Sequence, residues 1–210
     1  MNDLEKLKAG FKQFRNYYFK ENPELYRQLT EKGQSPGAII IACCDSRVHP
    51  AHVMNTDPGD IFVVRNVANL VPPCVDDGKT HGTSAAIEFA VKHLKVPHII
   101  VMGHSQCGGI RALMEVEHIG RKHNFIDPWM EIMAPARDSV NREFREATLE
   151  ERCSLCERAA ICVSLDNLLT FPFVRQAVAN RELQLHGWYF DIDNGILLER
   201  NPAENEFVPI

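Results

Sequence analysis

The sequence predicts an α/β protein with a mostly parallel central sheet, because short apolar runs alternate with amphipathic segments along its 210 residues. The first three runs are continuous and bounded by polar residues, which is typical of strands buried on both faces. Four parallel strands are expected, at 38–43, 61–64, 97–103 and 183–192. The turn sequence Asp193-Asn194-Gly195 then favours a hairpin, whose returning strand at 196–199 would be antiparallel.

The N-terminal residues predict a helical arm. Four apolar side chains recur at spacings of three and four over 3–19, as on one face of an amphipathic helix: Leu4, Leu7, Phe11 and Phe14. A short second helix is expected over 24–30. We therefore expect one domain over 1–210, in which 1–32 form an arm whose apolar face is covered by this subunit or by a partner.

The segments between the strands predict further helices, which would flank the sheet on both faces. These helices are expected at 49–54, from 82 to about 94, from 108 to about 117, and over 127–180 with breaks near 147–148 and 171–172. Gly, Ser and Pro residues make 33–37 a loop.

Composition and charge exclude several classes of function. The net charge is −5 and the basic residues are scattered, which argues against a nucleic-acid partner. No apolar run approaches the roughly 18 residues that a membrane span needs. The N-terminus lacks the apolar core of a signal peptide, so we expect a cytoplasmic protein. In a reducing cytosol, seven cysteines indicate metal binding or simple burial rather than a disulfide framework.

Soft metal ligands follow two of the expected strands. Cys43 ends the first strand, while His104 and Cys107 follow the third. Because ligands collect at the carboxyl ends of parallel strands, these residues are expected to form one site. Two thiolates and one imidazole match zinc, and three protein ligands leave the fourth position that a catalytic zinc keeps open. Gly108 would let backbone N–H groups approach a small anion closely.

Asp45 and Arg47 lie directly beyond Cys43. Arg47 would hold Asp45 in a bidentate pair and keep it ionised. Asp45 would then accept a hydrogen bond from zinc-bound hydroxide, or it would occupy the fourth position itself. A purely structural ion pair is the competing interpretation.

The motif Cys43-x-Asp45-x-Arg47, followed by His104-x-x-Cys107-Gly108-Gly109, closely resembles the β-class carbonic anhydrases. Segments 33–36, 62–72 and 164–170 also resemble that family, so the resemblance covers nearly the whole chain. It implies reversible hydration of carbon dioxide to bicarbonate and a proton, in which zinc-bound hydroxide attacks the substrate with the help of Asp45 and Arg47.

The resemblance also implies a substrate pocket shared between subunits. A glutamine at the position of Gln34 donates a hydrogen bond to substrate, and apolar residues matching Phe62 and Val67 wall the pocket from the partner subunit. The basic unit of the family is a homodimer with active sites at the interface, often assembled into larger homo-oligomers. The N-terminal helix typically packs on the partner.

Three positions depart from patterns found in the family. A regulated subgroup has a tryptophan where this chain has Ile40, so we expect the non-allosteric type. In that type the Asp45–Arg47 pair is formed and water is on the zinc at neutral pH. Phe89 stands where some relatives have tyrosine, and Cys44 stands where serine is common.

Two alternative functions remain open at this stage. The same scaffold could hydrolyse carbon disulfide or carbonyl sulfide, or it could bind zinc and bicarbonate without catalysis. The pair Cys153 and Cys156 is expected to be inert thiols, because it lies on an expected helix and no second pair accompanies it.

Overall fold

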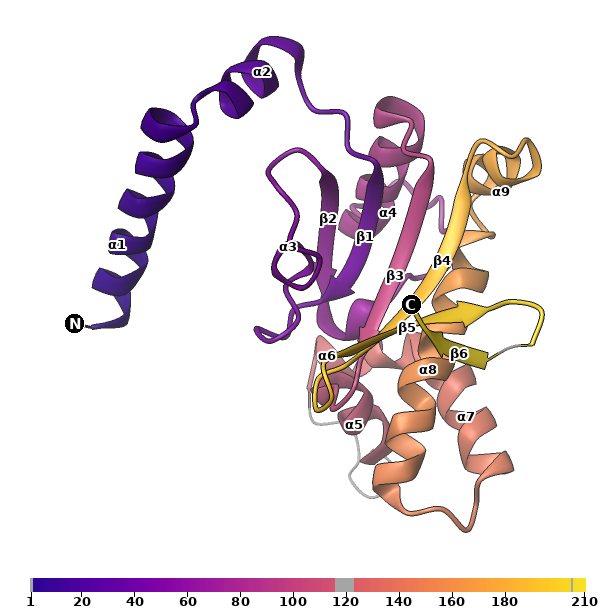
Figure 1. Cartoon of the computed structure of the whole chain (residues 1–210). Helices are drawn as coiled ribbons and strands as arrows, with labels where there is room; N and C mark the ends of the chain where they lie inside the picture. The colour runs from indigo at the N-terminus through magenta and orange to yellow at the C-terminus, as the bar shows by residue number, and fades with distance from the viewer. Residues whose placement is uncertain (1, 116–122, 205) are drawn as a thin grey trace.

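The computed structural model describes residues 2–115, 123–204 and 206–210 (Figure 1). A central sheet runs in the order β2-β1-β3-β4-β5-β6. Its strands are β1 (Ala38–Cys43), β2 (Ile61–Asn66), β3 (His98–His104), β4 (Gln184–Asp191), β5 (Ile196–Asn201) and β6 (Glu206–Pro209).

The helices lie where the sequence predicts them, with some boundaries shifted. The α-helices are α1 (Asp3–Asn16), α2 (Glu24–Lys32), α3 (Pro50–Val53), α4 (Gly82–Glu88), α5 (Gly108–Glu115), α6 (Ile126–Met130), α7 (Ala134–Glu143), α8 (Leu149–Leu168) and α9 (Pro172–Ala179). Shorter π and 3-10 segments are η1 (Tyr17–Glu21), η2 (Val67–Asn69), η3 (Phe89–Leu94) and η5 (Glu131–Met133). The expected end of the helix after Gly108, near Glu117, lies outside the described residues.

The predicted breaks in the long helical region have clear local causes. At the start of α8, the Thr148 hydroxyl accepts a hydrogen bond from the N–H of Glu151, whose carboxylate accepts one from the N–H of Thr148. This reciprocal cap satisfies backbone donors that a helix N-terminus otherwise leaves free. Pro172 begins α9, where its missing N–H costs no helical hydrogen bond.

The topology confirms the predicted sheet and adds one strand. Strands β2, β1, β3 and β4 are parallel neighbours, and β5 returns antiparallel to β4. The sequence analysis missed β6, which pairs antiparallel with β5. Four residues ending in a proline are too short a pattern to predict a strand, although an edge position tolerates proline.

The second strand is less buried than predicted. Residues 38–43 of β1 are all buried, whereas every residue of β2 is only half-buried in the single chain. The reason is position, because β2 forms an edge of the sheet and pairs on one side only. The expectation of a strand buried on both faces is therefore wrong for β2.

The main core lies between one face of the sheet and helices α4, α8 and α9. From the sheet, Ile39, Ile41, Ile99 and Val101 contribute side chains to this core. α8 lies unusually close to the sheet, because a Cβ atom at Gly103 would lie only 2.8 Å from Cδ1 of Ile161. Glycine at this position in β3 thus permits the approach of the helix that covers β1 and β3.

The arm formed by α1 and α2 extends away from the sheet (Figure 1). Neither helix contains a buried residue. Leu4, Leu7 and Phe11 are 60%, 71% and 62% exposed. Within the described residues, this chain therefore leaves the part of the apolar face of α1 formed by Leu4, Leu7 and Phe11 uncovered. The described helices also include none that is long and apolar enough to cross a membrane.

Candidate metal centre

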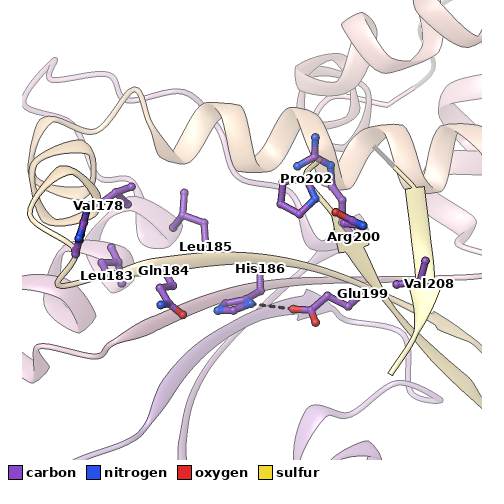
Figure 2. Close-up of a pocket in the computed structure, with 11 residues that line it drawn as sticks. Val178, Leu183, Gln184, Leu185, His186, Glu199, Arg200, Pro202 and Val208 are labelled. Carbon is purple, nitrogen blue, oxygen red and sulfur yellow. Dashed lines mark hydrogen bonds and ion pairs between the residues drawn. The ribbon is translucent and has the colours of Figure 1, made fainter. Parts of the chain in front are cut away.

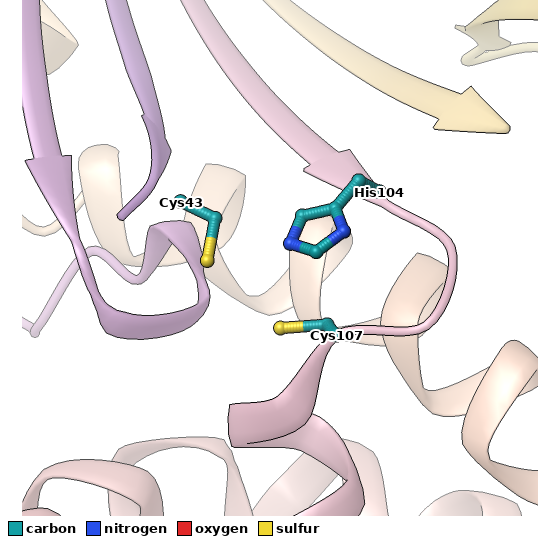
Figure 3. A group of neighbouring side chains, drawn as sticks. All are labelled: Cys43, His104 and Cys107. Carbon is teal, nitrogen blue, oxygen red and sulfur yellow. The ribbon is translucent and has the colours of Figure 1, made fainter. Parts of the chain in front are cut away.

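The predicted metal ligands meet where two neighbouring strands end. Cys43 is the last residue of β1 and His104 the last residue of β3, and these strands are parallel neighbours. Cys107 directly precedes α5. The three ligand atoms all lie within 4.8 Å of one another, and all three residues are buried (Figure 3). Among the described residues, no other group of three such side chains converges in this way.

The imidazole of His104 directs one ring nitrogen toward the sulfur atoms of Cys43 and Cys107 (Figure 3). Its Nδ1 lies 2.8 Å from the carbonyl oxygen of Ser105, which accepts a hydrogen bond from it. Nε2 then carries the lone pair, and it is buried with no hydrogen-bond partner in the part of the chain that the structure describes. Because an unpartnered buried nitrogen is unfavourable, and because its neighbours are two thiols, this set of donor atoms fits zinc.

The thiols of Cys43 and Cys107 shift each other's pKa in opposite directions. A hydrogen bond from the Cys107 thiol lowers the pKa of Cys43 well below its usual range. The same contact raises the pKa of Cys107. The backbone N–H of Asp45 also donates to Cys43 Sγ over 3.4 Å. A divalent cation would bind both sulfurs as thiolates and release the protons that they carry.

Asp45 and Arg47 form the pair that the sequence predicts. Arg47 donates from Nε to Oδ1 over 3.0 Å and from a terminal nitrogen to Oδ2 over 2.8 Å. Its backbone N–H donates to Oδ1 as well, over 2.9 Å. These contacts hold the pKa of Asp45 well below its usual range, so the carboxylate stays a hydrogen-bond acceptor.

Arg65 supports the same loop, and the sequence analysis did not single it out. From β2, its guanidinium donates to the carbonyl oxygens of Cys43 and Asp45 over 2.9 Å and 2.7 Å. The loop that joins Cys43 to Asp45 and Arg47 is thereby fixed to the neighbouring strand β2. The available signal was a charged residue that ends an apolar run.

Glu157 is a second residue that the sequence analysis missed. It lies on α8 and is only 5% exposed. Its carboxylate accepts hydrogen bonds from the N–H of Cys107, over 2.9 Å, and from the hydroxyl of Tyr189, over 2.8 Å. Burial raises the pKa of this carboxyl. Acidic residues on helices are usually solvated, so nothing in the sequence around Glu157 predicts this contact.

Val67 and Gly108 lie beside the metal ligands in the same chain. Val67 is 38% exposed, and its carbonyl oxygen accepts a hydrogen bond from Trp129 Nε1 over 2.8 Å. A Cβ at Gly109 would approach Cγ1 of Val67 to 2.9 Å, which places Val67 against the start of α5. At Gly108 a Cβ would meet no atom within 4 Å, so open space lies next to Cys107.

Gln34 and Phe62 do not reach the metal centre of their own chain. Gln34 precedes β1, and the start of β1 lies five residues, or about 16 Å, from Cys43. Phe62 pairs with Ile39, whereas Cys43 pairs with Asn66, which is about 13 Å further along β2. Any contact of these two residues with a substrate at this centre requires a second copy of the chain.

One sizeable cavity lies away from the metal ligands. It measures about 730 Å³ and opens between α9 and the beginning of β4 (Figure 2). Inside it, His186 Nδ1 lies 2.9 Å from a carboxylate oxygen of Glu199. His104 pairs with Phe190 near the far end of β4, so this cavity is separate from the metal centre.

Comparison with known proteins identifies the family. A family model described as carbonic anhydrase matches residues 38–197. Beta carbonic anhydrase 3 of Arabidopsis thaliana is 40% identical over 197 residues, which are 93% of this chain and 76% of that protein. The chain belongs to the β-carbonic anhydrase family. The resemblance carried by the cysteine, histidine and aspartate motifs is thereby confirmed.

Solved structures of β-carbonic anhydrases share the fold. The β-carbonic anhydrase CcaA superposes with a TM-score of 0.93 at 31% identity and covers 100% of both chains. A tetrameric β-carbonic anhydrase of Sordaria macrospora gives a TM-score of 0.83 at 33% identity, over 95% of this chain and 97% of that one. The central sheet and its flanking helices are thus those of this enzyme family.

Cys153 and Cys156 show no feature of a second site in this β-carbonic anhydrase. Both are buried on α8 and unpaired. Burial raises the pKa of both thiols, to about 12 for Cys156. Both thiols stay protonated near neutral pH, which supports the interpretation as inert core residues.

Proposed function

We propose that this chain catalyses the reversible hydration of carbon dioxide to bicarbonate and a proton, with zinc held by Cys43, His104 and Cys107. The observation that carries the proposal is the convergence of three soft ligand atoms within 4.8 Å, beside an ionised carboxylate. When bound there, zinc would act as a Lewis acid that makes water nucleophilic near neutral pH.

Asp45 would orient the reacting water. Arg47 occupies both carboxylate oxygens, so Asp45 is held by the guanidinium instead of turning toward the metal ligands. Its remaining lone pairs could accept a hydrogen bond from a water molecule that zinc would activate. This arrangement corresponds to the non-allosteric type, and a structure near pH 7.5 with Asp45 bound to zinc would refute it.

The substrate pocket would combine two copies of the chain. Val67 and the open space at Gly108 come from the subunit that holds the metal. Gln34 and Phe62 would come from the other subunit, because Gln34 precedes the start of β1, about 16 Å from Cys43, and Phe62 lies about 13 Å along β2 from the partner of Cys43. Gln34 would donate a hydrogen bond to substrate, and Phe62 would exclude water.

The N-terminal arm would hold these copies together. We propose that residues 1–32 form an arm on an otherwise single domain, and that the uncovered apolar face of α1 packs on a second copy. The tetrameric relative from Sordaria macrospora supports assembly into a homo-oligomer. A cytoplasmic location stays a prediction, with which the unpaired cysteines agree.

Placing charge on the apolar face of α1 is expected to dissociate the oligomer. Leu7→Asp with Phe11→Asp would remove two apolar side chains from an interface, each contributing about 1.5–3 kcal/mol. Sedimentation velocity at micromolar concentration would then show monomer, and hydration activity would fall because Gln34 and Phe62 no longer reach the partner's site. Gln13→Asp, on the polar face of the same helix, is the matched control. An unchanged sedimentation coefficient in the double variant would contradict the arm's role.

The function is tested by stopped-flow hydration of carbon dioxide between about pH 6.5 and 9, on protein with its zinc content assayed. Near-stoichiometric zinc with rapid hydration is expected. Arg47 keeps Asp45 ionised across this range, so activity that appears with rising pH would not come from deprotonation of Asp45. Full zinc without hydration would contradict the proposal. It would favour a bicarbonate-binding protein or a hydrolase, and carbon disulfide would be the next substrate tested.

A further inference from the structure

Arg47 makes a second set of hydrogen bonds in addition to those with Asp45. One terminal nitrogen donates to the side-chain oxygen of Gln106 over 3.2 Å, and the other donates to the backbone carbonyl oxygen of Gln106 over 3.3 Å. Gln106 lies inside the loop that carries His104 and Cys107. The guanidinium therefore bridges the catalytic carboxylate and the metal-binding loop.

Gln106 in turn is held by Asp193. Its side-chain nitrogen donates to both carboxylate oxygens of Asp193, over 2.6 Å and 2.8 Å. The amide orientation follows from its neighbours, because a guanidinium only donates and a carboxylate only accepts hydrogen bonds. An uncharged amide serves both partners at once, whereas an acidic side chain would repel Asp193 and a basic one would repel Arg47.

The turn that carries Asp193 is fastened to the metal-binding loop. Ser105 donates its N–H to the carbonyl oxygen of Phe190 over 3.0 Å, and its hydroxyl accepts the N–H of Ile192 over 2.8 Å. Gln106 has a φ of 59°, a left-handed conformation that is unfavourable for a residue with a side chain. Contacts at both ends of Gln106 thus maintain a conformation that the chain alone disfavours.

From this geometry we propose that Gln106 and Asp193 are positioning residues for the hydration reaction, acting through Arg47 on Asp45. The proposal rests on the proposed function, and it adds Gln106, at an unspecified position within the His104-x-x-Cys107 motif, and Asp193, which lies outside the motif. The Arg47 side chain is 44% exposed. Without Gln106 it would have one fewer anchor and more rotational freedom. The hydrogen bonds that run from Asp193 through Gln106 and Arg47 to Asp45 hold the Arg47 side chain in place before the reaction, so that Asp45 faces the reacting water.

A double-mutant cycle between Gln106 and Arg47 tests this coupling. Gln106→Ala is expected to lower kcat/KM by about five- to tenfold in the native background. This is the effect expected from losing one partly exposed charge-assisted hydrogen bond. In an Arg47→Ala background the same substitution is expected to change kcat/KM by less than about twofold. Equal losses in both backgrounds would overturn the proposal, because Gln106 would then act independently of Arg47.

Exchanging the hydrogen-bond donor and acceptor between Gln106 and Asp193 should restore activity. Gln106→Glu alone places two carboxylates together and is expected to lower kcat/KM by more than about tenfold. Combining it with Asp193→Asn restores an amide-to-carboxylate hydrogen bond at the same net charge, and activity should return to within about threefold of native. Failure of the double variant to exceed Gln106→Glu alone would contradict the linked arrangement.

Two control variants separate positioning from general damage. Asn194→Ala alters the same turn by removing the side-chain hydrogen bond to Asp191, so activity should stay near native. Gln184→Ala removes an exposed glutamine from the other end of β4. An activity loss in Asn194→Ala equal to that in Gln106→Ala would attribute the effect to turn stability and overturn the proposal.

A readout without activity distinguishes this proposal from the proposed function. In the zinc-loaded full chain, NMR of the Arg47 guanidinium, assigned with Arg47→Lys, should show slow rotation about the Nε–Cζ bond. Rotation should become faster in Gln106→Ala. Unchanged rotation would overturn the positioning role even in an active enzyme. If rotation is slow in a zinc-loaded protein that does not hydrate carbon dioxide, the hydrogen bonds that position Arg47 are supported. The proposed function is then contradicted.

Discussion

Replacing Cys107 with serine is expected to release the metal and abolish most of the hydration activity. A serine hydroxyl stays protonated near neutral pH, so it cannot replace the thiolate at the start of α5. Loss of an outer hydrogen-bond partner of a metal ligand already costs about 10- to 100-fold in metal affinity. Loss of a ligand itself should therefore lower zinc affinity by more than about 100-fold.

Zinc per chain after dialysis against a chelator measures this effect, together with stopped-flow hydration. Cys44→Ser is the matched control, because this thiol is exposed and lies next to a ligand without belonging to the converging group. The control should keep both zinc and activity. Stoichiometric zinc in Cys107→Ser would show that the three side chains do not form the metal centre.

Replacing Asp45 with asparagine is expected to leave zinc bound while lowering kcat/KM by about 100- to 1,000-fold. The two side chains have nearly the same shape, but the amide offers one acceptor where the carboxylate offers two. Its NH2 group would face a guanidinium that only donates, so the pair with Arg47 would break on one side. The acceptor that orients the reacting water would be lost together with the negative charge.

Zinc content and steady-state hydration kinetics distinguish the outcomes for Asp45→Asn. Asp138→Asn is the matched control, since Asp138 also accepts a hydrogen bond from a neighbouring arginine, over 2.9 Å, but lies on α7. Native activity in Asp45→Asn would show that the Asp45–Arg47 pair is only a structural ion pair. Loss of zinc in the same variant would assign Asp45 to metal binding instead of catalysis.

Much of the metal centre was predictable because its determinants are local in the sequence. The softness of thiolate and imidazole depends on residue type alone, and the apolar runs before Cys43 and His104 predict two buried strands. Parallel strands place their carboxyl ends at one edge of the sheet, so the two segments had to meet if they were neighbours. The structure shows that they are neighbours.

The supporting contacts were not predictable, because each joins residues that only tertiary packing brings together. Gln106 and Asp193 are separated by 87 positions in the sequence, and their contact depends on how the hairpin after β4 docks on the metal-binding loop. Glu157 is buried only because α8 packs against the sheet beside Cys107. A polar side chain carries no local signal that separates such a contact from ordinary solvation.

The sequence by itself determined the ligand chemistry, the periodicity of the strands and helices, and the Asp45–Arg47 pair, because these depend on residue type and short spacing. Only the tertiary structure decided which residues share one end of the sheet. It placed Val67 against Gly109 at the start of α5 and put Gln34 and Phe62 at the opposite end. The physical reason is strand length, since a strand that rises about 3.3 Å per residue separates its two ends beyond the reach of any side chain.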